Sequence, residues 1–237
     1  MIGHSMLRAA AKKRAVGDPY WSNVSTLCNF TSNFNDVKGK TATTFGGIAI
    51  SAGAATFDGV DDYFSFADSS DFALGSGDFT IEFFTTIGAG VKAADNYYSM
   101  VMQFSGVADN ASLYCYFESR ASGSNRAWTC RWFDNSAATL VNLEEAANAV
   151  NDYVEGQEYH IAIVRSGSTF TLYRDGVQKA TATYSGSLPD AGGAVWIGRA
   201  AAGTPYYKGS MGALRITKGV ARYTGPFTPP PNVFPEG

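Results

Sequence analysis

The chain has 237 residues, of which 45% are hydrophobic and 16% are charged, and its formal net charge at pH 7 is −3. This is enough apolar chain for one large core, and the near-neutral charge gives no reason to expect a nucleic-acid surface on the main domain. Glycine (26 residues) and aromatic residues (14%) are plentiful, which favours many short strands joined by tight turns.

The first 17 residues differ from the rest, because four basic side chains occur before the first acidic residue, Asp18. They are Arg8, Lys12, Lys13 and Arg14. Such a segment is either a solvated tail or an arm that packs on a partner. We therefore expect a basic N-terminal arm over 1–17, one domain over 18–225 and a proline-rich tail over 226–237.

No segment approaches the roughly 18 to 20 apolar residues of a membrane helix, and residues 1–15 lack the apolar run of a signal peptide. We expect no membrane partner and folding in a cytoplasm. The three cysteines, Cys28, Cys115 and Cys130, are too few for a disulfide framework. Buried thiols are expected, although Cys115 and Cys130 could meet across neighbouring strands.

Alternation of side-chain character predicts strands along the chain. In the run 79–84, Phe79, Ile81 and Phe83 face one way and the residues between them face the other, as in a half-buried strand. The same pattern predicts strands at 113–118, 127–133, 158–165, 169–174, 177–183, 194–198 and 209–217. Only residues 143–150 suggest a helix. The sequence therefore indicates an all-β domain.

A hairpin and a proline tail mark the end of the sheet. Asp175-Gly176 is a two-residue turn of a kind that tolerates positive φ, between two alternating runs. Five prolines follow later in the chain, each without a backbone donor: Pro226, Pro229, Pro230, Pro231 and Pro235. The sheet should therefore end by about Thr217, with the tail extended on a surface.

Five motifs follow one another in the order found in laminin-G-like domains of the concanavalin A-like lectin/glucanase superfamily, and over roughly residues 18–231 the chain resembles that family. They are FDGVDDYF (57–64), GSGDFTIEF (75–83), EYHIAIVR (158–165), FTLYRDGV (170–177) and WIG (196–198). The resemblance implies a concanavalin A-like jelly-roll sandwich of two antiparallel sheets, whose concave face and rim loops often bind glycans, sometimes with calcium. The end segments DPYW (18–21) and ITKGVARYT (216–224) resemble those of tailed-bacteriophage virion proteins.

The acidic residues do not form the pattern that hydrolases of this superfamily use, a strand of the type Glu-x-Asp-x-x-Glu. Glu82 and Glu118 each stand alone, and the pair Glu144-Glu145 falls on the expected helix. His160 is a single strand histidine, which is more often a packed or surface residue than a catalyst. We expect no catalytic residue and no enzymatic activity.

A cluster of carboxylates is the candidate metal site. Asp58, Asp61 and Asp62 fall in one turn and could hold Ca²⁺ through hard oxygen ligands. Two places where relatives carry further carboxylates hold NFTSN (29–33) and MGA (211–213) instead. A turn-forming role is therefore favoured for the three aspartates, and no cofactor is expected beyond this candidate calcium ion.

Loop tyrosines are the candidate sugar-binding residues, because a flat ring can stack on the apolar face of a pyranose. Two pairs fall between predicted strands, Tyr97-Tyr98 and Tyr206-Tyr207. The alternative is that these pairs form an interface or pack within a loop. The tryptophans within predicted strands are instead expected in the core: Trp128, Trp132 and Trp196.

These observations favour a non-enzymatic virion surface protein (decoration, fibre or tail-associated) with a lectin-like domain for host glycans. The alternative is a free carbohydrate-binding module or adhesin. The expected partners are other virion proteins, a cell-surface glycan and further copies of the chain in a homo-oligomer. Assembly contacts are expected in the basic arm and at Pro229, Pro230 and Pro231, and the expected location is the virion, after folding in the host cytoplasm.

Overall fold

The computed structural model describes residues 17–91, 97–104, 113–120, 125–134, 136–146, 153–190, 192–200 and 203–237. The basic residues of the expected arm, Arg8, Lys12, Lys13 and Arg14, lie outside the described residues. No helix in the described part of the chain has the length and apolar character that crossing a bilayer requires.

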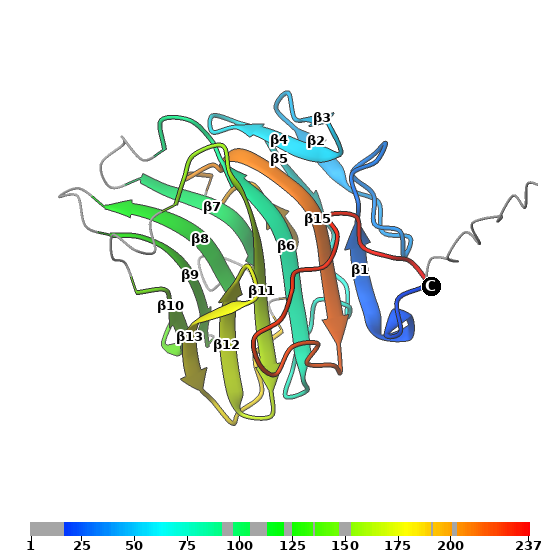
Figure 1. The fold of residues 1–237 in the computed structure, drawn as a ribbon, viewed down its shortest axis with the longest axis vertical. Helices are drawn as coiled ribbons and strands as arrows, with labels where there is room; N and C mark the ends of the chain where they lie inside the picture. Colours follow the sequence, from blue (N-terminus) through cyan, green and yellow to red (C-terminus); the bar gives the residue numbers. More distant parts are fainter. Residues whose placement is uncertain are drawn as a thin grey trace, which may run out of the picture.

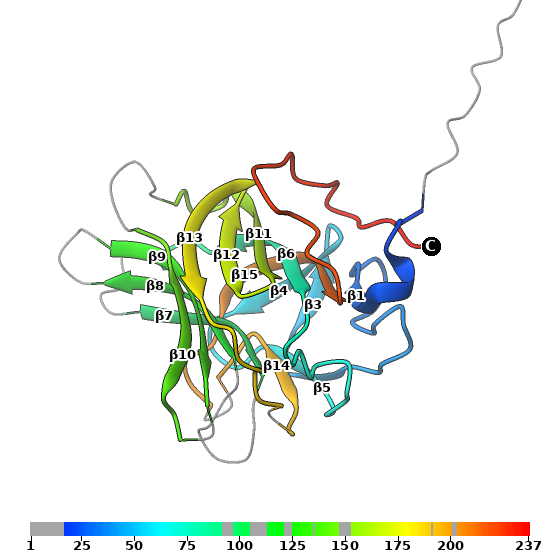
Figure 2. The same ribbon diagram turned by 90° about the horizontal axis from the view of Figure 1, so that it is seen from below.

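Two antiparallel sheets stack against each other (Figures 1 and 2), which confirms the expected all-β sandwich. The eight-stranded sheet has the order β13-β12-β11-β6-β15-β4-β3, with β1 beside β15. Its strands are β1 (Val24–Cys28), β3 (Ala49–Ser51), β4 (Ala54–Asp58), β6 (Phe79–Ile87), β11 (Glu158–Ser166), β12 (Thr169–Arg174), β13 (Val177–Thr183) and β15 (Lys208–Lys218).

The seven-stranded sheet has the order β10-β9-β8-β7-β14-β5-β2. Its strands are β2 (Thr43–Phe45), β5 (Tyr63–Phe66), β7 (Tyr97–Phe104), β8 (Leu113–Arg120), β9 (Asn125–Phe133), β10 (Thr139–Glu144) and β14 (Val195–Ile197). A single turn of 3-10 helix, η1 (Trp21–Asn23), precedes β1. The helix expected over 143–150 is wrong in its described part, because Leu143 and Glu144 end strand β10.

Aromatic side chains fill the space between the sheets. Phe79 and Phe83 of β6 point inward and meet Trp132 and Trp128 of β9, with ring centroids 5.9 and 5.7 Å apart. All four side chains are buried. The alternation predicted for these strands, with Trp128 and Trp132 in the core, is therefore confirmed.

The predicted hairpin joins β12 to β13. Asp175 and Gly176 both have positive φ, 51° and 75°, as a type I′ turn requires. The C-terminal tail passes directly over this turn, and the Phe227 amide donates to the Gly176 carbonyl at 3.1 Å. A Cβ atom at Gly176 would overlap the carbonyl oxygen of Phe227, so glycine is needed here for close approach as well as for φ.

Residues 219–237 form a strap across the outer face of the eight-stranded sheet, the red trace in Figure 1. Phe227 stacks on Tyr223 with centroids 3.5 Å apart, and Phe234 packs against Phe84 of β6 at 5.6 Å. Strand β6 is therefore buried on both faces, with Glu82 0% and Phe84 6% exposed, and the expectation of a half-buried strand is wrong.

Candidate functional site

The outer face of the seven-stranded sheet carries a cluster of partly exposed aromatic rings around one arginine, which we call the aromatic cluster. Phe45 of β2 stacks on Tyr63 of β5 with centroids 4.3 Å apart and an interplanar angle of 10°. Trp196 of β14 lies 5.7 Å from Tyr63, and Tyr206 lies 6.2 Å from it. The cluster thus gathers rings from three strands and one loop.

Arg199 lies at the centre of the aromatic cluster. Its guanidinium carbon is 4.6 Å from the centroid of Tyr63, 4.8 Å from that of Trp196 and 6.0 Å from that of Tyr206. These are cation–π distances, and an isolated β-bridge joins the backbones of Arg199 and Tyr206. The Arg199 Nε also donates to the Ala200 carbonyl at 2.7 Å, which fixes the side chain over the rings.

Strand alternation explains why these rings point outward. Val195 and Ile197 are buried between the sheets, so Trp196 between them must project from the opposite face. The same holds for Tyr63, because its neighbour Phe64 is in the core. The expectation that Trp196 is a core residue is therefore wrong. Apolar residues on both sides of this tryptophan were the signal that could have placed it.

A set of polar side chains lies further along the same face, on β9 and β10. Arg131 of β9 points outward, because its neighbours in the strand, Cys130 and Trp132, point into the core. It donates to Asn142 Oδ1 at 2.8 Å and pairs with Glu144 at 3.4 Å. The guanidinium also lies 5.9 Å from the ring of Tyr116 on β8. The face therefore combines flat apolar rings at one end with hydrogen-bonding side chains at the other.

Tyr207 is not a surface residue, contrary to the expectation for a loop tyrosine that binds a ligand. Its side chain is 0% exposed, and its hydroxyl lies within hydrogen-bond distance of two acceptors, the carbonyl oxygens of Thr86 (2.9 Å) and Ser210 (3.2 Å). Burial raises the pKa of the phenol well above its usual range. Tyr207 therefore closes the core beneath Tyr206 and cannot stack on a sugar.

Tyr97 and Tyr98 begin strand β7 instead of occupying a loop. Their backbones pair with Ser119 and Glu118 of β8. The side chains of both tyrosines lie outside the described residues. Of the two expected tyrosines whose side chains the structure describes, Tyr206 joins the aromatic cluster and Tyr207 does not.

The prolines expected at assembly contacts belong to the strap. Pro229 and Pro230 are partly buried and Pro231 is exposed. Asn232, next along the strap, accepts a hydrogen bond from the Ala213 amide at 3.4 Å. This part of the tail therefore follows the chain's own sheet.

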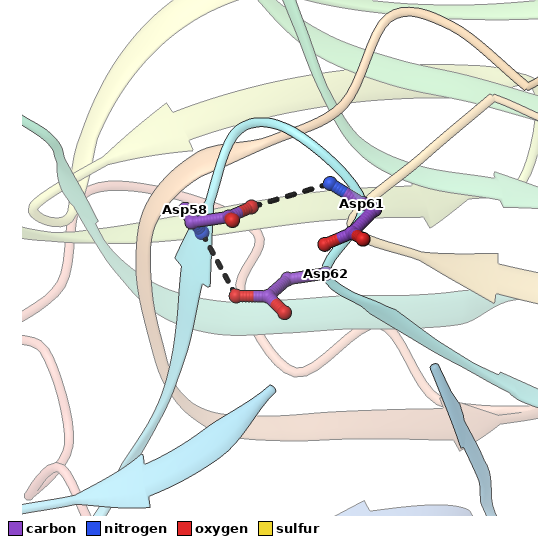
Figure 3. A group of neighbouring side chains, drawn as sticks. All are labelled: Asp58, Asp61 and Asp62. Carbon is purple, nitrogen blue, oxygen red and sulfur yellow. Dashed lines mark hydrogen bonds between the residues drawn. The ribbon is translucent and has the colours of Figure 1, made fainter. Parts of the chain in front are cut away.

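The three aspartates of the candidate metal site come together in the turn between β4 and β5, as Figure 3 shows. One carboxylate oxygen from each lies within 4.8 Å of the others. Asp62 is buried and accepts hydrogen bonds from the amides of Gly47 (2.6 Å) and Asp58 (3.0 Å). Asp58 accepts from the amide of Val60 at 2.7 Å, a bond that lowers the pKa of Asp58.

The three carboxylates are of the type that binds calcium, but they are too few to complete its coordination shell. Ca²⁺ takes about six to eight oxygen ligands, from carboxylates, carbonyl groups and waters, and three aspartates would supply only part of this set. Asp58 and Asp62 already satisfy backbone amides, which is what a tight turn requires. The turn also positions the aromatic cluster, because Tyr63 follows Asp62 directly.

A buried charge network lies on the opposite side of the molecule, beneath the strap, and was not foreseen from the sequence. Glu82 of β6 receives hydrogen bonds from Arg215 of β15 (2.9 Å) and from the hydroxyl of Tyr223 in the strap (2.8 Å). His160 Nε2 of β11 lies 3.1 Å from the same carboxylate. Glu82 is therefore not isolated, and strand register is what unites these residues: Arg215 and His160 flank β6 on neighbouring strands.

Asp18 completes the network at its other end. Its carboxylate accepts from Arg215 at 2.8 Å and from both terminal nitrogens of Arg222 at 3.0 and 2.7 Å. Burial opposes ionisation of Asp18, but the Arg222 hydrogen bond and the charges of Arg222 and Arg215 outweigh it and lower the pKa. The two carboxylates are ionised anchors of the fold, and the strap covers them.

The stacked antiparallel sheets define a jelly-roll sandwich. The strap covers one outer face of this sandwich, and the other outer face carries the aromatic cluster. A laminin-G family model, described as the concanavalin A-like lectin/glucanases superfamily, matches residues 58–221. The chain belongs to this superfamily. Among curated proteins, no sequence matches it significantly.

Solved structures of binding domains share this fold. Domain 4 of AbnA, a GH43 extracellular arabinanase from Geobacillus stearothermophilus in complex with arabinotriose, has a TM-score of 0.60 at 16% identity, covering 84% of this chain and 94% of that domain. The receptor-binding domain of botulinum neurotoxin D has a TM-score of 0.64 at 10% identity, covering 84% of this chain and 50% of that one.

The binding domain of Paraclostridial Mosquitocidal Protein 1 has a TM-score of 0.58 at 13% identity, covering 84% of this chain and 48% of that one. The chain thus spans about half the length of these toxin domains and nearly all of the arabinanase domain. At these identities the likeness concerns the fold.

Proposed function

We propose that this chain is a non-enzymatic carbohydrate-binding domain that holds its ligand on the aromatic cluster. The observation that carries the proposal is the set of partly exposed rings of Tyr63, Trp196 and Tyr206 around Arg199 on one sheet face. Such rings can stack on the apolar face of a pyranose, and the neighbouring polar side chains can bond its hydroxyl groups. The arabinanase domain, solved with arabinotriose, gives the fold a precedent in sugar binding.

The absence of enzymatic activity is supported by how the buried carboxylates are used. Glu82 and Asp18 are paired with arginines under the strap, and Glu145 pairs with Arg174 at 3.1 Å. A general acid needs a carboxyl group that a substrate can reach, and glycosidases place two of them on either side of one bond. Among the described residues, these three buried carboxylates do not meet that condition.

The test is a glycan array with the intact protein, followed by calorimetry on the best ligand with Trp196→Ala and Tyr63→Ala. Each substitution should weaken binding about tenfold, because it removes one stacking surface. Tyr20→Ala is the matched control, since Tyr20 is an aromatic residue that is 41% exposed and lies outside the cluster. An intact protein with no signal on the array, or affinities unchanged in both cluster variants, would contradict the proposal.

We further propose that the chain serves as a virion surface protein, with the free binding module or adhesin as the alternative. The support is the likeness of residues 18–21 and 216–224 to phage virion proteins, together with the basic arm. Deleting residues 1–15 should then abolish incorporation into particles while leaving glycan binding intact. Normal incorporation without the arm would count against the virion role, and loss of glycan binding alone would leave that role standing.

A further inference from the structure

Two cysteines face each other inside the seven-stranded sheet. Cys115 of β8 and Cys130 of β9 are register partners on adjacent antiparallel strands, and their sulfur atoms lie 2.8 Å apart. Two non-bonded carbon atoms in good contact are about 3.5–4.0 Å apart, and sulfur is the larger atom. The two sulfur atoms are therefore closer than ordinary packing of two thiols places them.

The backbone geometry suits a covalent bond between them. Residues directly opposite each other in an antiparallel pair have Cα atoms about 4.5–5.5 Å apart, within the range of about 4.4–6.8 Å found for disulfides. An S–S bond is about 2.05 Å long, so each sulfur atom would have to move by only about 0.4 Å. Side-chain rotation can supply this without a shift of the strands.

The surroundings separate this pair from the third cysteine. Cys115 and Cys130 are both 0% exposed, and burial and the neighbouring Cys115 raise the pKa of the Cys130 thiol. Cys28 is also 0% exposed but belongs to β1 of the eight-stranded sheet. The odd cysteine count thus divides into one pair and one single thiol, Cys28.

We propose that Cys115 and Cys130 form a disulfide that staples β8 to β9 when the chain folds in the presence of a disulfide oxidant. One cysteine thiolate attacks the oxidant, for example oxidised glutathione, forms a mixed disulfide and releases one glutathione thiolate. The second cysteine thiolate attacks the protein sulfur and releases the second. The two cysteine protons end on the two glutathione molecules, so the protein is oxidised by two electrons and the oxidant is reduced by two.

The order of events follows from burial. Neither thiol is exposed in the fold, so the exchange takes place before the sheets close over the pair. Once formed, the bond is shielded from reductants by the same core. The pair is therefore a structural crosslink fixed during folding and independent of ligand binding.

The experiment uses Cys28→Ser, which leaves only the pair. The variant is unfolded, refolded with oxidised and reduced glutathione, and its thiols are counted under denaturing, non-reducing conditions. We expect no free thiol, a monomeric mass lower by about 2 Da, and a Tm roughly 5–10 °C above the same variant refolded with reductant. The double variant Cys28→Ser/Cys115→Ala is the control for oxidation that does not involve the pair.

Two free thiols in refolded Cys28→Ser would overturn the inference, as would glutathione adducts or disulfide-linked dimers in place of the internal bond. A disulfide that forms but lowers Tm would contradict the geometric argument. To guard against a folding defect from the serine itself, the wild-type chain is refolded in parallel and mapped by proteolysis. Its crosslinked peptide should join Cys115 to Cys130 and leave Cys28 to the alkylating reagent.

Discussion

Glu82 has no exposed surface, and its carboxylate contacts polar side chains from three separate parts of the chain. Arg215 comes from β15, His160 from β11 and Tyr223 from the strap. Removing a buried charge from water is costly unless partners surround it, so the loss of one partner leaves the others unbalanced. The network therefore makes packing of the strap and pairing of the central strands depend on each other.

Glu82→Gln should lower the free energy of unfolding by about 3 kcal/mol or more, because Arg215 loses one of its two charged partners in the interior. Urea denaturation measures this. Glu144→Gln is the matched control, since Glu144 pairs with Arg131 at a site where both side chains are about one-third exposed, and it should change stability by less than about 0.5 kcal/mol. Equal effects of the two substitutions would contradict the role given to the network.

The same network predicts the response to acid. Burial opposes ionisation of Glu82, but the His160 hydrogen bond and the Arg215 charge outweigh it, so its folded-state pKa lies below the ordinary value of 4.5. Ionised Glu82 therefore stabilises the fold fully above about pH 4.5, and this contribution is lost as pH falls through the lower folded-state pKa. The stability difference between wild type and Glu82→Gln should be constant near neutral pH and shrink below about pH 4; a difference that grows on acidification would contradict the sign.

The acidic turn offers a test of calcium against turn formation. If Asp62 serves the turn, Asp62→Ala should destabilise the protein by about 2 kcal/mol, because the amides of Asp58 and Gly47 lose their shared acceptor, the buried Asp62 carboxylate, and EDTA should leave Tm unchanged. Asp61→Asn is the control, since Asp61 is exposed. A Tm that rises with added calcium chloride in wild type but not in Asp61→Asn would establish a metal site instead.

At the scale of elements, the strap depends on the hairpin beneath it. Phe227 crosses Gly176 at hydrogen-bond distance and packs between Tyr223 and Tyr173, so the turn and the strap share one contact. The strap in turn covers Ala162, Val164 and Tyr173 on the outer face of β11 and β12. The residue at position 176 therefore decides whether a segment some 50 positions later can pack on the sheet.

Gly176→Ala should lower Tm by more than Gly167→Ala does. Both glycines have positive φ, which costs alanine about 1–2 kcal/mol, but nothing lies within 4 Å of a Cβ at Gly167, whereas at Gly176 it meets the strap. Hydrogen exchange should also show faster exchange of the Phe227 amide in Gly176→Ala only. Equal losses in the two variants, with unchanged exchange, would mean that the strap does not rest on the turn.

Many of the strands and turns could be predicted from the sequence. Strand β13 and the turn before it follow from alternation and from Asp175-Gly176, because both are local signals. The cover over β6 could not be predicted, since the residues Thr80, Glu82 and Phe84 show only that its second face is mixed and not which segment lies on it. The expectation that Trp196 lies in the core fails for a related reason, because aromatic residues occur both in cores and on exposed faces. The buried residues on either side of Trp196 are what indicate that it points outward.

On the scale of the whole molecule, the two outer faces differ in what covers them. Residues 219–237 cover β6, β11 and β12 on the outer face of the eight-stranded sheet (Figure 2). The seven-stranded sheet carries Tyr63, Trp196 and Arg199, which are partly exposed. The proposed glycan site therefore lies on the face that the strap does not cover. The fold class could be predicted from the motifs, but the difference between the two faces depends on contacts between distant segments and could not.

The hydrogen bond between the Asp18 amide and the Glu236 carbonyl, 3.0 Å long, has a topological consequence. It brings the two ends of the folded unit together, so a short Gly/Ser linker could join residue 237 to residue 17 without stretching either. Opening the chain at the exposed Ala52-Gly53 turn between β3 and β4 would then give a circular permutant with the same two sheets. For the same reason the unit could be inserted as a whole into a loop of another protein, entering and leaving it at one point.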